Sequence, residues 1–343
     1  MKKCNNGSIL ITTLWIMAIL SLFALGVGFR ASIEVRLNKY NFDKLEAVYL
    51  AKAGFLKSME LLGKDTNEYD NLYACGITLE AGKKLEDLFA SVANKLGDGS
   101  FSICYKSKNE KGNSGIFYGM MDEERKINLN FDKLAPGNLA EYKRIIKGLS
   151  PNMTDEIVNA VIDWQDTDDN RTYPGGAEDF EYEAELGYSS KDERFSVPEE
   201  LLLVKGVTAE LYKEIKDNIT TFGSGKININ TASEGVLTAV IDDGKGTYAS
   251  LIENIIKFRQ GEDGLDGTSD DGTFLNVVEL MGLAEENFEK DRISQMSSLF
   301  SVKSDTFRIE SRGEASKIIK EITFVAERTA EKGKKGILYY HED

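Results

Sequence analysis

The chain has 343 residues, of which 41% are hydrophobic, 29% charged and only 4 proline, which is typical of two or three folded domains rather than of a disordered chain. Its net charge of −15 disfavours a broad surface for DNA or anionic lipid. The single histidine, His341, lies at the C-terminal end, which excludes a Ser-His-Asp triad and a histidine-ligated zinc site as interpretations.

The first predicted element is a membrane helix. Residues 8–29 carry no charge and, at ~1.5 Å per residue, would cross a hydrocarbon layer of ~30 Å. The run exceeds the apolar core of a signal peptide, and no small-residue cleavage site follows it. Lys2 and Lys3 precede it, so the N-terminus is expected in the cytoplasm and the body of the chain on the other side of the membrane.

The helical pattern continues beyond the membrane segment. Apolar residues recur at helical spacing from Ile33 to Leu62, with charged residues between them. The sequence therefore predicts one helix from about Ser8 to Leu62, whose second half packs an apolar stripe on a folded domain.

A short basic leader that ends in Gly7 precedes this helix. It resembles the leader of type IV pilins and type II secretion pseudopilins. The resemblance implies that a prepilin peptidase cleaves between Gly7 and Ser8 and methylates the new N-terminus. Such subunits usually carry glutamate at the fifth mature position, which here is Thr12. Loss of that glutamate is a trait of the minor pseudopilin K branch and suits a subunit at the tip of a fibre.

Short apolar segments at both ends of the body predict strands. Residues 100–106 and 115–121 read as one hairpin, and residues 307–311 and 318–328 as a second antiparallel pair around Gly313. A small antiparallel sheet packed on the long helix would bury both apolar faces. We therefore expect an α+β fold, in outline the pilin fold.

Helical patterns dominate the region between these strands, and PEELLLVKG and FLNVVELMGL are among them. The predicted organisation is a leader (1–7), a transmembrane helix (8–29), the first part of a pilin-like domain (30–131), an inserted α-helical domain (132–296) and closing strands (297–343). Residues 126–130 and 226–230 have similar sequences, KINLN and KININ. The similarity could mark two domain junctions, reflect an internal repeat or be a coincidence, and the sequence does not distinguish these interpretations.

Three motifs in a fixed order carry a more specific resemblance, to the minor pseudopilin K family of type II secretion systems. They are DWQDTDDNRTYPGGAEDFEY (163–182), SVPEELLLVKGVTAELYKEI (196–215) and GKININTA (225–232). The resemblance implies a structural subunit without enzymatic activity, at the tip of a periplasmic pseudopilus that exports folded proteins across the outer membrane. The implied partners are minor pseudopilins I and J, the major pseudopilin G, the prepilin peptidase and the inner-membrane assembly platform.

Two acidic segments are candidate metal sites. The first contains hard oxygen donors that suit Ca²⁺, at Asp163, Asp166, Asp168, Asp169, Asn170, Glu178 and Asp179. The alternative is a solvated acidic loop, but calcium sites in this region are a family trait, and we predict Ca²⁺. The second alternates carboxylates with glycines, at Asp263, Asp266, Asp270 and Asp271. It could bind a second Ca²⁺ or form an exposed turn. Paired carboxylates also occur as the acid and base of glycosidases, but the sequence predicts no substrate cleft for such a pair.

The competing functions are a minor pilin of a surface fibre and a DNA-uptake protein. Residues 201–206 and the helix after them resemble helix-hairpin-helix modules that bind DNA, and Lys205 and Lys213 are present. The surrounding acidic residues give little attraction for phosphate. Cys75 and Cys104 could be two thiols or one disulfide, because sequence separation says nothing about their distance.

Overall fold

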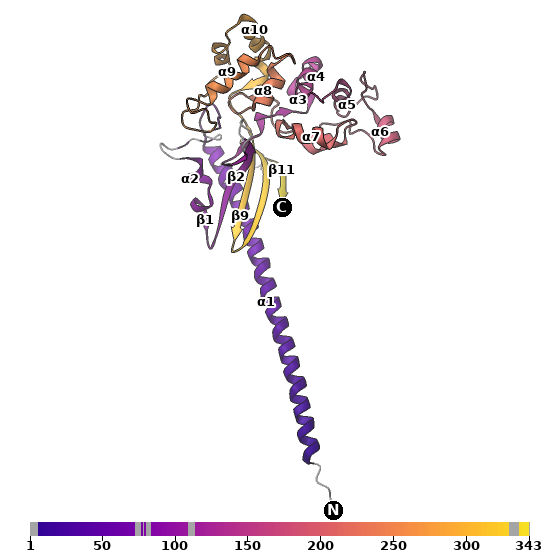
Figure 1. The fold of residues 1–343 in the computed structure, drawn as a ribbon, viewed down its shortest axis with the longest axis vertical. Coiled ribbons are helices and arrows are strands. Elements are labelled where there is room, and N and C mark those ends of the chain that lie inside the picture. The colour runs from indigo at the N-terminus through magenta and orange to yellow at the C-terminus, as the bar shows by residue number, and fades with distance from the viewer. Residues whose placement is uncertain are drawn as a thin grey trace, which may run out of the picture.

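The computed structural model describes residues 6–72, 77, 79, 84–108, 114–328 and 336–342. The basic leader residues Lys2 and Lys3, the turn of the first hairpin and Cys75 lie outside the described residues. Figure 1 shows a long helix that rises from the N-terminus to a sheet, with a helical lobe at the far end of the molecule.

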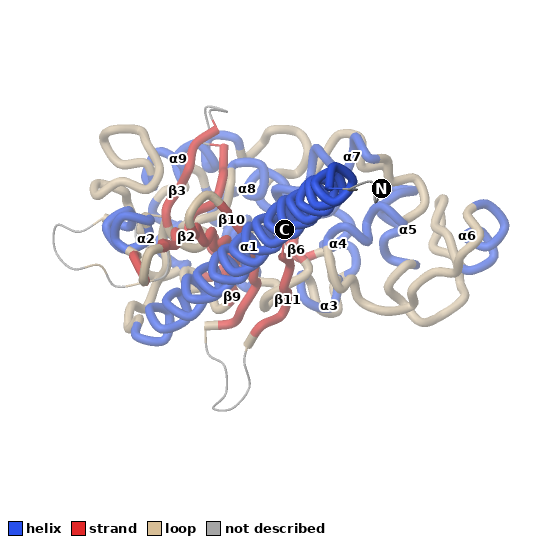
Figure 2. Tube along the Cα trace, turned by 90° about the horizontal axis from the view of Figure 1, so that it is seen from below, coloured by secondary structure: helices blue, strands red, loops and turns tan. Residues whose placement is uncertain are grey.

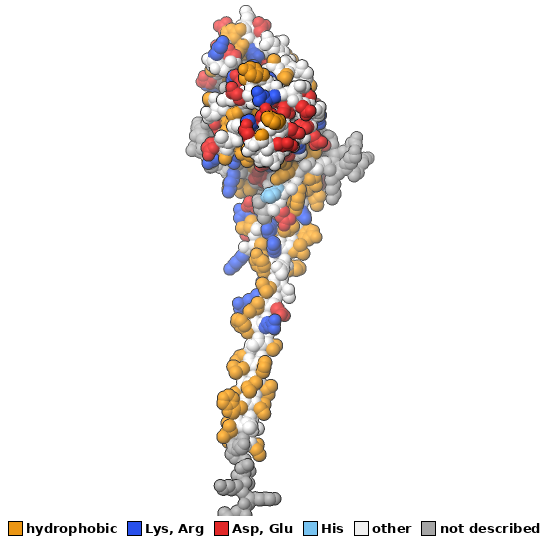
Figure 3. All heavy atoms as spheres, turned by 90° about the vertical axis from the view of Figure 1, so that its right-hand side faces the viewer, with side chains coloured by type: hydrophobic (Ala, Val, Ile, Leu, Met, Phe, Trp, Pro, Cys, Tyr) orange, Lys and Arg blue, Asp and Glu red, His pale blue; other side chains and the backbone are white. Residues whose placement is uncertain are grey.

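The long helix α1 (Asn6–Lys64) confirms the prediction of one continuous helix. Its side chains from residue 9 to residue 42 are all exposed, and the first buried side chains of the helix are those of Ala47 and Val48. Figure 3 shows hydrophobic side chains along the lower stalk, followed by charged ones nearer the body. One stretch of α1 is apolar and long enough to span a membrane.

The sheet is antiparallel throughout, with the order β1-β2-β9-β10-β11, and β3 and β4 pair with β2 and β9. Its strands are β1 (Lys95–Leu96), β2 (Gly99–Lys108), β3 (Ser114–Tyr118), β4 (Met121–Asp122), β9 (Thr306–Ala315), β10 (Ile318–Glu327) and β11 (Ile337–Glu342). Both predicted strand pairs form. The helix α2 (Leu85–Phe89) and the 3₁₀ turn η1 (Ser91–Ala93) precede β1.

Gly313 is not in the turn of the second hairpin, as the sequence suggested. It lies inside β9 opposite Lys320, and the turn is at Ser316, whose φ is 56°. A Cβ atom at Gly313 would stand 2.0 Å from the carbonyl oxygen of Ala47, so this glycine is where the backbone of α1 approaches the sheet. Figure 2 shows α1 lying across the strands, and the apolar core between them includes Leu50, Phe55, Phe101, Ile309 and Phe324.

The helical lobe has its own hydrophobic core, which extends from Ile127 to Phe300 and is therefore slightly wider than the predicted insert of 132–296. Its α-helices are α3 (Phe131–Leu134), α4 (Leu139–Lys147), α5 (Asp155–Asp163), α6 (Asp179–Glu185), α7 (Ala209–Ile215), α8 (Glu234–Ile241), α9 (Ala249–Arg259) and α10 (Asn287–Met296). Its 3₁₀ helices are η2 (Glu123–Arg125), η3 (Pro198–Leu203), η4 (Lys216–Asn218), η5 (Val277–Gly282) and η6 (Ser297–Leu299).

The lobe contains two successive units of the same design. The KINLN and KININ segments each provide a short strand, β5 (Ile127–Asn128) and β7 (Ile227–Asn228). These pair in parallel with β6 (Ile219–Thr220) and β8 (Phe300–Ser301), which close the two units. In the first unit Asn130 exchanges two hydrogen bonds with the backbone of Phe195, and in the second Asn230 does the same with Phe274. Of the interpretations left open by the sequence, the structure supports an internal repeat.

Buried polar residues join the sheet to the lobe. One carboxylate oxygen of Asp122 in β4 accepts hydrogen bonds from Asn228, Thr231 and Ser304, at 2.9, 2.7 and 2.7 Å. Arg328, at the end of β10, forms ion pairs with Asp65 and Asp70 in the segment that follows α1. The bonds of Asp122 therefore fix the lobe to the sheet, and those of Arg328 fix the sheet to the segment after α1.

Candidate functional site

The first acidic segment folds around the C-terminal end of α5. Thr154 caps this helix by accepting a hydrogen bond from the Ile157 amide, as its sequence predicted. Asp163 ends the helix and is fully buried, and the Thr172 amide donates to both of its carboxylate oxygens, at 3.1 and 3.0 Å. These bonds fold the loop back over the helix end.

Other acidic side chains gather around Asp163. Burial and then the neighbouring charges of Asp163 and Asp166 raise the pKa of Glu178 to about 8. Burial, followed by Asp163, Asp168 and Asp192, raises the pKa of Asp166 to about 6. We call this group of Asp163, Asp166, Asp168, Glu178 and Asp192 the acidic cluster.

Two oxygen atoms of the acidic cluster have no hydrogen-bond partner. They are Oε1 of Glu178, a residue only 5% exposed, and Oδ1 of Asp166, and both atoms are buried. A buried carboxylate oxygen without a partner is costly unless a proton or a cation satisfies it. The donors are hard oxygens on a loop, which is the chemistry that Ca²⁺ prefers. Among the described residues no group of three or more His, Cys, Asp or Glu forms a ready-made metal site, so ligation would need small side-chain adjustments.

The structure brings together only part of the predicted ligand set. Asp163, Asp166, Asp168 and Glu178 belong to the acidic cluster. Asp169 and Asn170 are exposed, and Asp179 instead accepts hydrogen bonds from the Ser190 amide and hydroxyl, at 2.9 and 2.7 Å. Sequence reasoning missed Asp192, which lies beyond the motif and follows the Tyr188–Lys191 loop. Its positive φ of 53° is not visible in the sequence.

The second acidic segment satisfies its carboxylates internally. Asp270 accepts from the amides of Glu262 and Asp263, and Asp271 from those of Gly267 and Thr268, at 2.8 to 3.2 Å. Asp263 likewise accepts from the Leu265 amide. The described contacts leave fewer free oxygens here than in the acidic cluster, and the second metal site stays a prediction.

The two units also differ at the position before a core aromatic residue. Trp164 stacks on Phe195 in the first unit, and Phe258 contacts Phe274 in the second, so Trp164 and Phe258 occupy matching positions. The residue before each is Asp163 in the first unit and Lys257 in the second. Asp163 is buried and organises the loop of the first unit, whereas Lys257 is exposed and pairs with Glu253.

In the segment that resembles a helix-hairpin-helix module, the hairpin contacts other residues of the lobe. The Lys205 amide, which lies between η3 and α7, donates to the Tyr182 hydroxyl at 3.1 Å, and Lys205 Nζ pairs with Glu185 at 2.7 Å. Backbone amides and cations in such a hairpin are the groups that would contact DNA phosphates. In this chain they bind protein groups instead.

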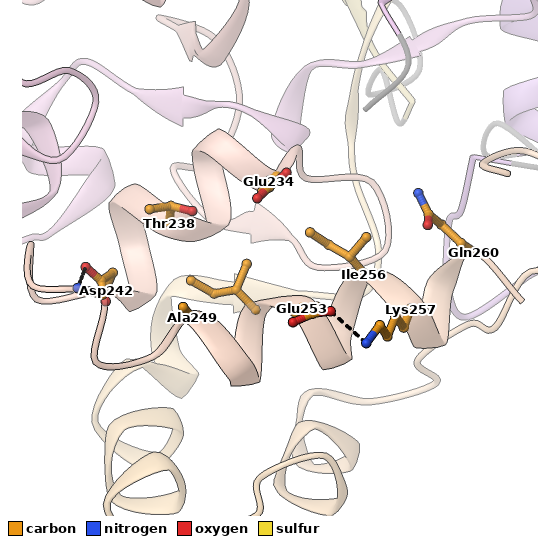
Figure 4. Close-up of a pocket in the computed structure, with 10 residues that line it drawn as sticks. Glu234, Thr238, Asp242, Ala249, Glu253, Ile256, Lys257 and Gln260 are labelled. Carbon is orange, nitrogen blue, oxygen red and sulfur yellow. Dashed lines mark hydrogen bonds and ion pairs between the residues drawn. The ribbon is translucent and has the colours of Figure 1, made fainter. Parts of the chain in front are cut away.

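A groove of about 470 Å³ lies between α8 and α9 (Figure 4). Its carboxylates are largely engaged: Glu253 pairs with Lys257 at 2.7 Å, and Asp242 accepts from the amides of Gly244 and Gly246. The acidic cluster, with its unpartnered oxygens, is the stronger candidate for a ligand site.

Near the other end of the chain, Thr12 occupies the second turn of α1. Its hydroxyl donates to the Ile9 carbonyl at 2.9 Å, and the residue is exposed. The predicted cleavage position between Gly7 and Ser8 falls within the first turn of α1.

Comparisons with known proteins agree with this architecture. Residues 126–223, the first unit of the lobe, match the family model of type II secretion system protein K. The chain is 26% identical over 278 residues to the type II secretion system protein K of Pseudomonas aeruginosa, covering 79% of this chain and 77% of that protein.

The fold also matches a solved structure. A chain in the crystal structure of the GspK-GspI-GspJ complex from the enterotoxigenic Escherichia coli type 2 secretion system aligns with a TM-score of 0.62 and 15% identity, covering 90% of this chain and 99% of that one. These comparisons support the resemblance to the minor pseudopilin K: the chain is similar to type II secretion system protein K over most of its length.

Proposed function

We propose that this chain is the tip subunit of a type II secretion pseudopilus and takes part in the export of folded proteins across the outer membrane. The main support for this proposal is the position of the lobe, which lies at the end of the molecule opposite the N-terminus (Figure 1). A subunit stacked above this one would have to occupy the same space. In this proposal α1 holds the chain in the inner membrane until it enters the fibre, and the sheet and lobe lie in the periplasm.

Thr12 supports the same position in the fibre. In the family's fibres, glutamate at this position is expected to neutralise the terminal amine of a neighbouring subunit, because an unpaired charge in lipid is costly. Threonine has no charge to contribute. Processing by the prepilin peptidase between Gly7 and Ser8, with methylation of Ser8, would precede entry through the inner-membrane assembly platform.

The proposed partners are minor pseudopilins I and J, above the major pseudopilin G. The solved relative forms a complex with GspI and GspJ. In this chain α1 carries a stripe that faces away from the sheet and has the spacing of a helix–helix seam. Its apolar members Phe42, Leu45, Tyr49 and Leu56 are all more than half exposed. We call this the α1 stripe, and it offers a contact for a partner helix.

Co-purification tests the proposal. Residues 30–343 retain both hydrophobic cores, because the described side chains of α1 before residue 43 are all exposed. We expect this fragment to co-elute with minor pseudopilins I and J of the same system. Replacing Leu45 and Tyr49 with Gln should abolish co-elution, whereas Lys44→Gln, next to the stripe, should not. If no complex forms either with or without a calcium chelator, the proposal is wrong.

We also propose that the acidic cluster binds one Ca²⁺. The unpartnered oxygens of Glu178 and Asp166 support this, with Asp163, Asp168 and Asp192 as further oxygen donors. Isothermal titration should give one equivalent, and Glu178→Gln should weaken binding at least tenfold. Glu183→Gln, on the exposed side of α6, is the matched control. A second equivalent, lost on Asp270→Asn, would support the second site, and no binding at all would refute both.

A further inference from the structure

The region around the acidic cluster holds much of the charge of the whole chain. Residues 163–192 contain ten acidic and two basic residues, which gives a net charge of −8 out of −15. Both basic residues are already paired, Arg171 with Glu181 and Lys191 with Glu200. The acidic cluster does not include exposed acidic residues such as Asp169 and Glu183.

The same region displays the two most exposed aromatic side chains of the described residues. Tyr173 is 84% exposed and Phe180 is 79% exposed, more than any aromatic residue in the exposed part of α1. Leu186, directly after α6, is 47% exposed. Large apolar side chains that are exposed together and rimmed by charge are a common mark of interaction surfaces.

The backbone that carries these aromatic residues is fixed. On one side of Tyr173, the Thr172 amide donates hydrogen bonds to Asp163. On the other side, the Pro174 carbonyl accepts a hydrogen bond from the Asn159 side chain at 2.7 Å. Phe180 follows Asp179, whose carboxylate is held by Ser190. Aromatic side chains on a fixed backbone lose little conformational freedom on binding and are typical binding hot spots.

Figure 3 views the molecule from the side on which α6 lies in Figure 1. Acidic side chains gather on this face of the lobe around a few hydrophobic ones, with few basic side chains near them. A second copy of this chain would bring a second strongly acidic surface against the first. The charge therefore favours a different, cationic partner.

We propose that Tyr173, Phe180 and Leu186, with the acidic rim of Asp169 and Glu183, form a docking surface for a protein that presents lysine or arginine side chains around an apolar contact. We call it the acidic–aromatic surface. The aromatic residues supply buried area and cation–π contacts, and the rim selects positive charge. It is distinct from the α1 stripe and lies next to the proposed calcium site, because the Thr172 amide, directly before Tyr173, is bonded to Asp163.

A peptide probe tests this surface in the full chain. The probe is a synthetic peptide of alternating arginine and phenylalanine, and the control replaces every arginine with glutamate. With calcium present, we expect the arginine peptide to bind wild type at least tenfold more tightly than the Tyr173→Ser, Phe180→Ser double variant. Val278→Ser, which removes an apolar side chain 73% exposed on the second unit, should bind like wild type.

Equal binding of the arginine peptide to wild type and to the double variant would overturn the proposal, since it would indicate attraction to net charge alone. Binding of the glutamate peptide would overturn it as well. Calcium titration and co-purification with minor pseudopilins I and J are carried out on the same double variant. Both should be unchanged, so a failure of this surface can be told apart from a failure of the proposed tip function or calcium site.

Discussion

Gly176 lies directly against the carboxylate of Asp163, so closely that a Cβ atom at Gly176 would stand 2.1 Å from Asp163 Oδ2 and 2.5 Å from the Thr172 carbonyl oxygen. Any side chain at Gly176 must therefore displace the loop from the helix end. Gly176→Ala should weaken calcium binding at least tenfold and lower the free energy of unfolding by about 1–3 kcal/mol. Calcium titration and urea denaturation measure the two effects.

Gly282→Ala is the control for that substitution. Gly282 ends η5 in the second unit, and a Cβ atom there would meet nothing within 4 Å. It should leave calcium affinity unchanged and stability within about 0.5 kcal/mol of wild type. Wild-type calcium affinity in Gly176→Ala would mean that the acidic cluster is not the binding site.

The pH dependence of stability should contain a component from Glu124. Burial and then the charge of Asp122 raise the pKa of this carboxyl to about 7, although the Ser224 amide donates to it. Between pH ~4.5 and ~7 the folded chain holds a proton that the unfolded chain has released. The free energy of unfolding therefore falls as pH rises through this window, by up to about 3 kcal/mol from this residue.

Glu124→Gln should remove that component. The difference in stability between Glu124→Gln and wild type should grow in favour of the variant from pH 5 to pH 8. Glu123 does not interfere, because Lys126 and Arg308 outweigh the effect of its burial and hold its pKa at about 2. A difference that is constant over this range would show that the Glu124 carboxyl titrates normally.

Arg328 connects the end of β10 to the segment after α1. It pairs with Asp65 at 2.5 Å and Asp70 at 2.6 Å, and all three side chains are almost completely buried. Arg328→Gln leaves two buried carboxylates without a counter-charge, and loss of one partner of such a group costs about 3–5 kcal/mol. Urea denaturation measures this loss. Arg312→Gln, an exposed residue 3.9 Å from Glu321, should cost at most about 1 kcal/mol.

Local patterns in the sequence predicted the helix, the strand pairs and the position of the lobe. Periodicity alone located α1 to within two residues at each end, because apolar spacing is a local property. Gly313 was misplaced because its role depends on the approach of α1, which is more than 240 residues away in sequence. The segments of η3 and η5 have apolar spacing that suits a helix but form short 3₁₀ helices.

The acidic cluster was only partly predictable for the same reason. Composition marked the segment, but which carboxylates converge depends on the fold of the loop around Asp163. Asp179 accepts a hydrogen bond from the Ser190 amide and lies outside the cluster, whereas Asp192, which follows the motif in sequence, belongs to it. The sequence of the second acidic segment looked equally suitable. The fold distinguishes the two, because two buried oxygens in the first segment lack hydrogen-bond partners, whereas Asp263, Asp270 and Asp271 accept hydrogen bonds within the second.

The repeat itself leads to a last prediction, because it places the same amide side chain at the centre of each unit. Asn130 accepts from the Phe195 amide at 2.8 Å and donates to its carbonyl at 3.2 Å, and Asn230 does the same with Phe274 at 2.8 and 3.0 Å. Both asparagines are buried. Removing either side chain leaves a buried amide and carbonyl without partners, at a cost of about 1–3 kcal/mol for each group.

Asn130→Ala and Asn230→Ala should therefore destabilise the chain by similar amounts, about 2–4 kcal/mol in urea denaturation. Native-state hydrogen exchange should show faster exchange of the Phe195 amide in the first variant and of the Phe274 amide in the second. Asn152→Ala, which removes an exposed contact with Glu214 at 3.3 Å, is the control and should be close to neutral. If only one of the two variants is destabilised, the units share a backbone design without sharing the interaction that holds it.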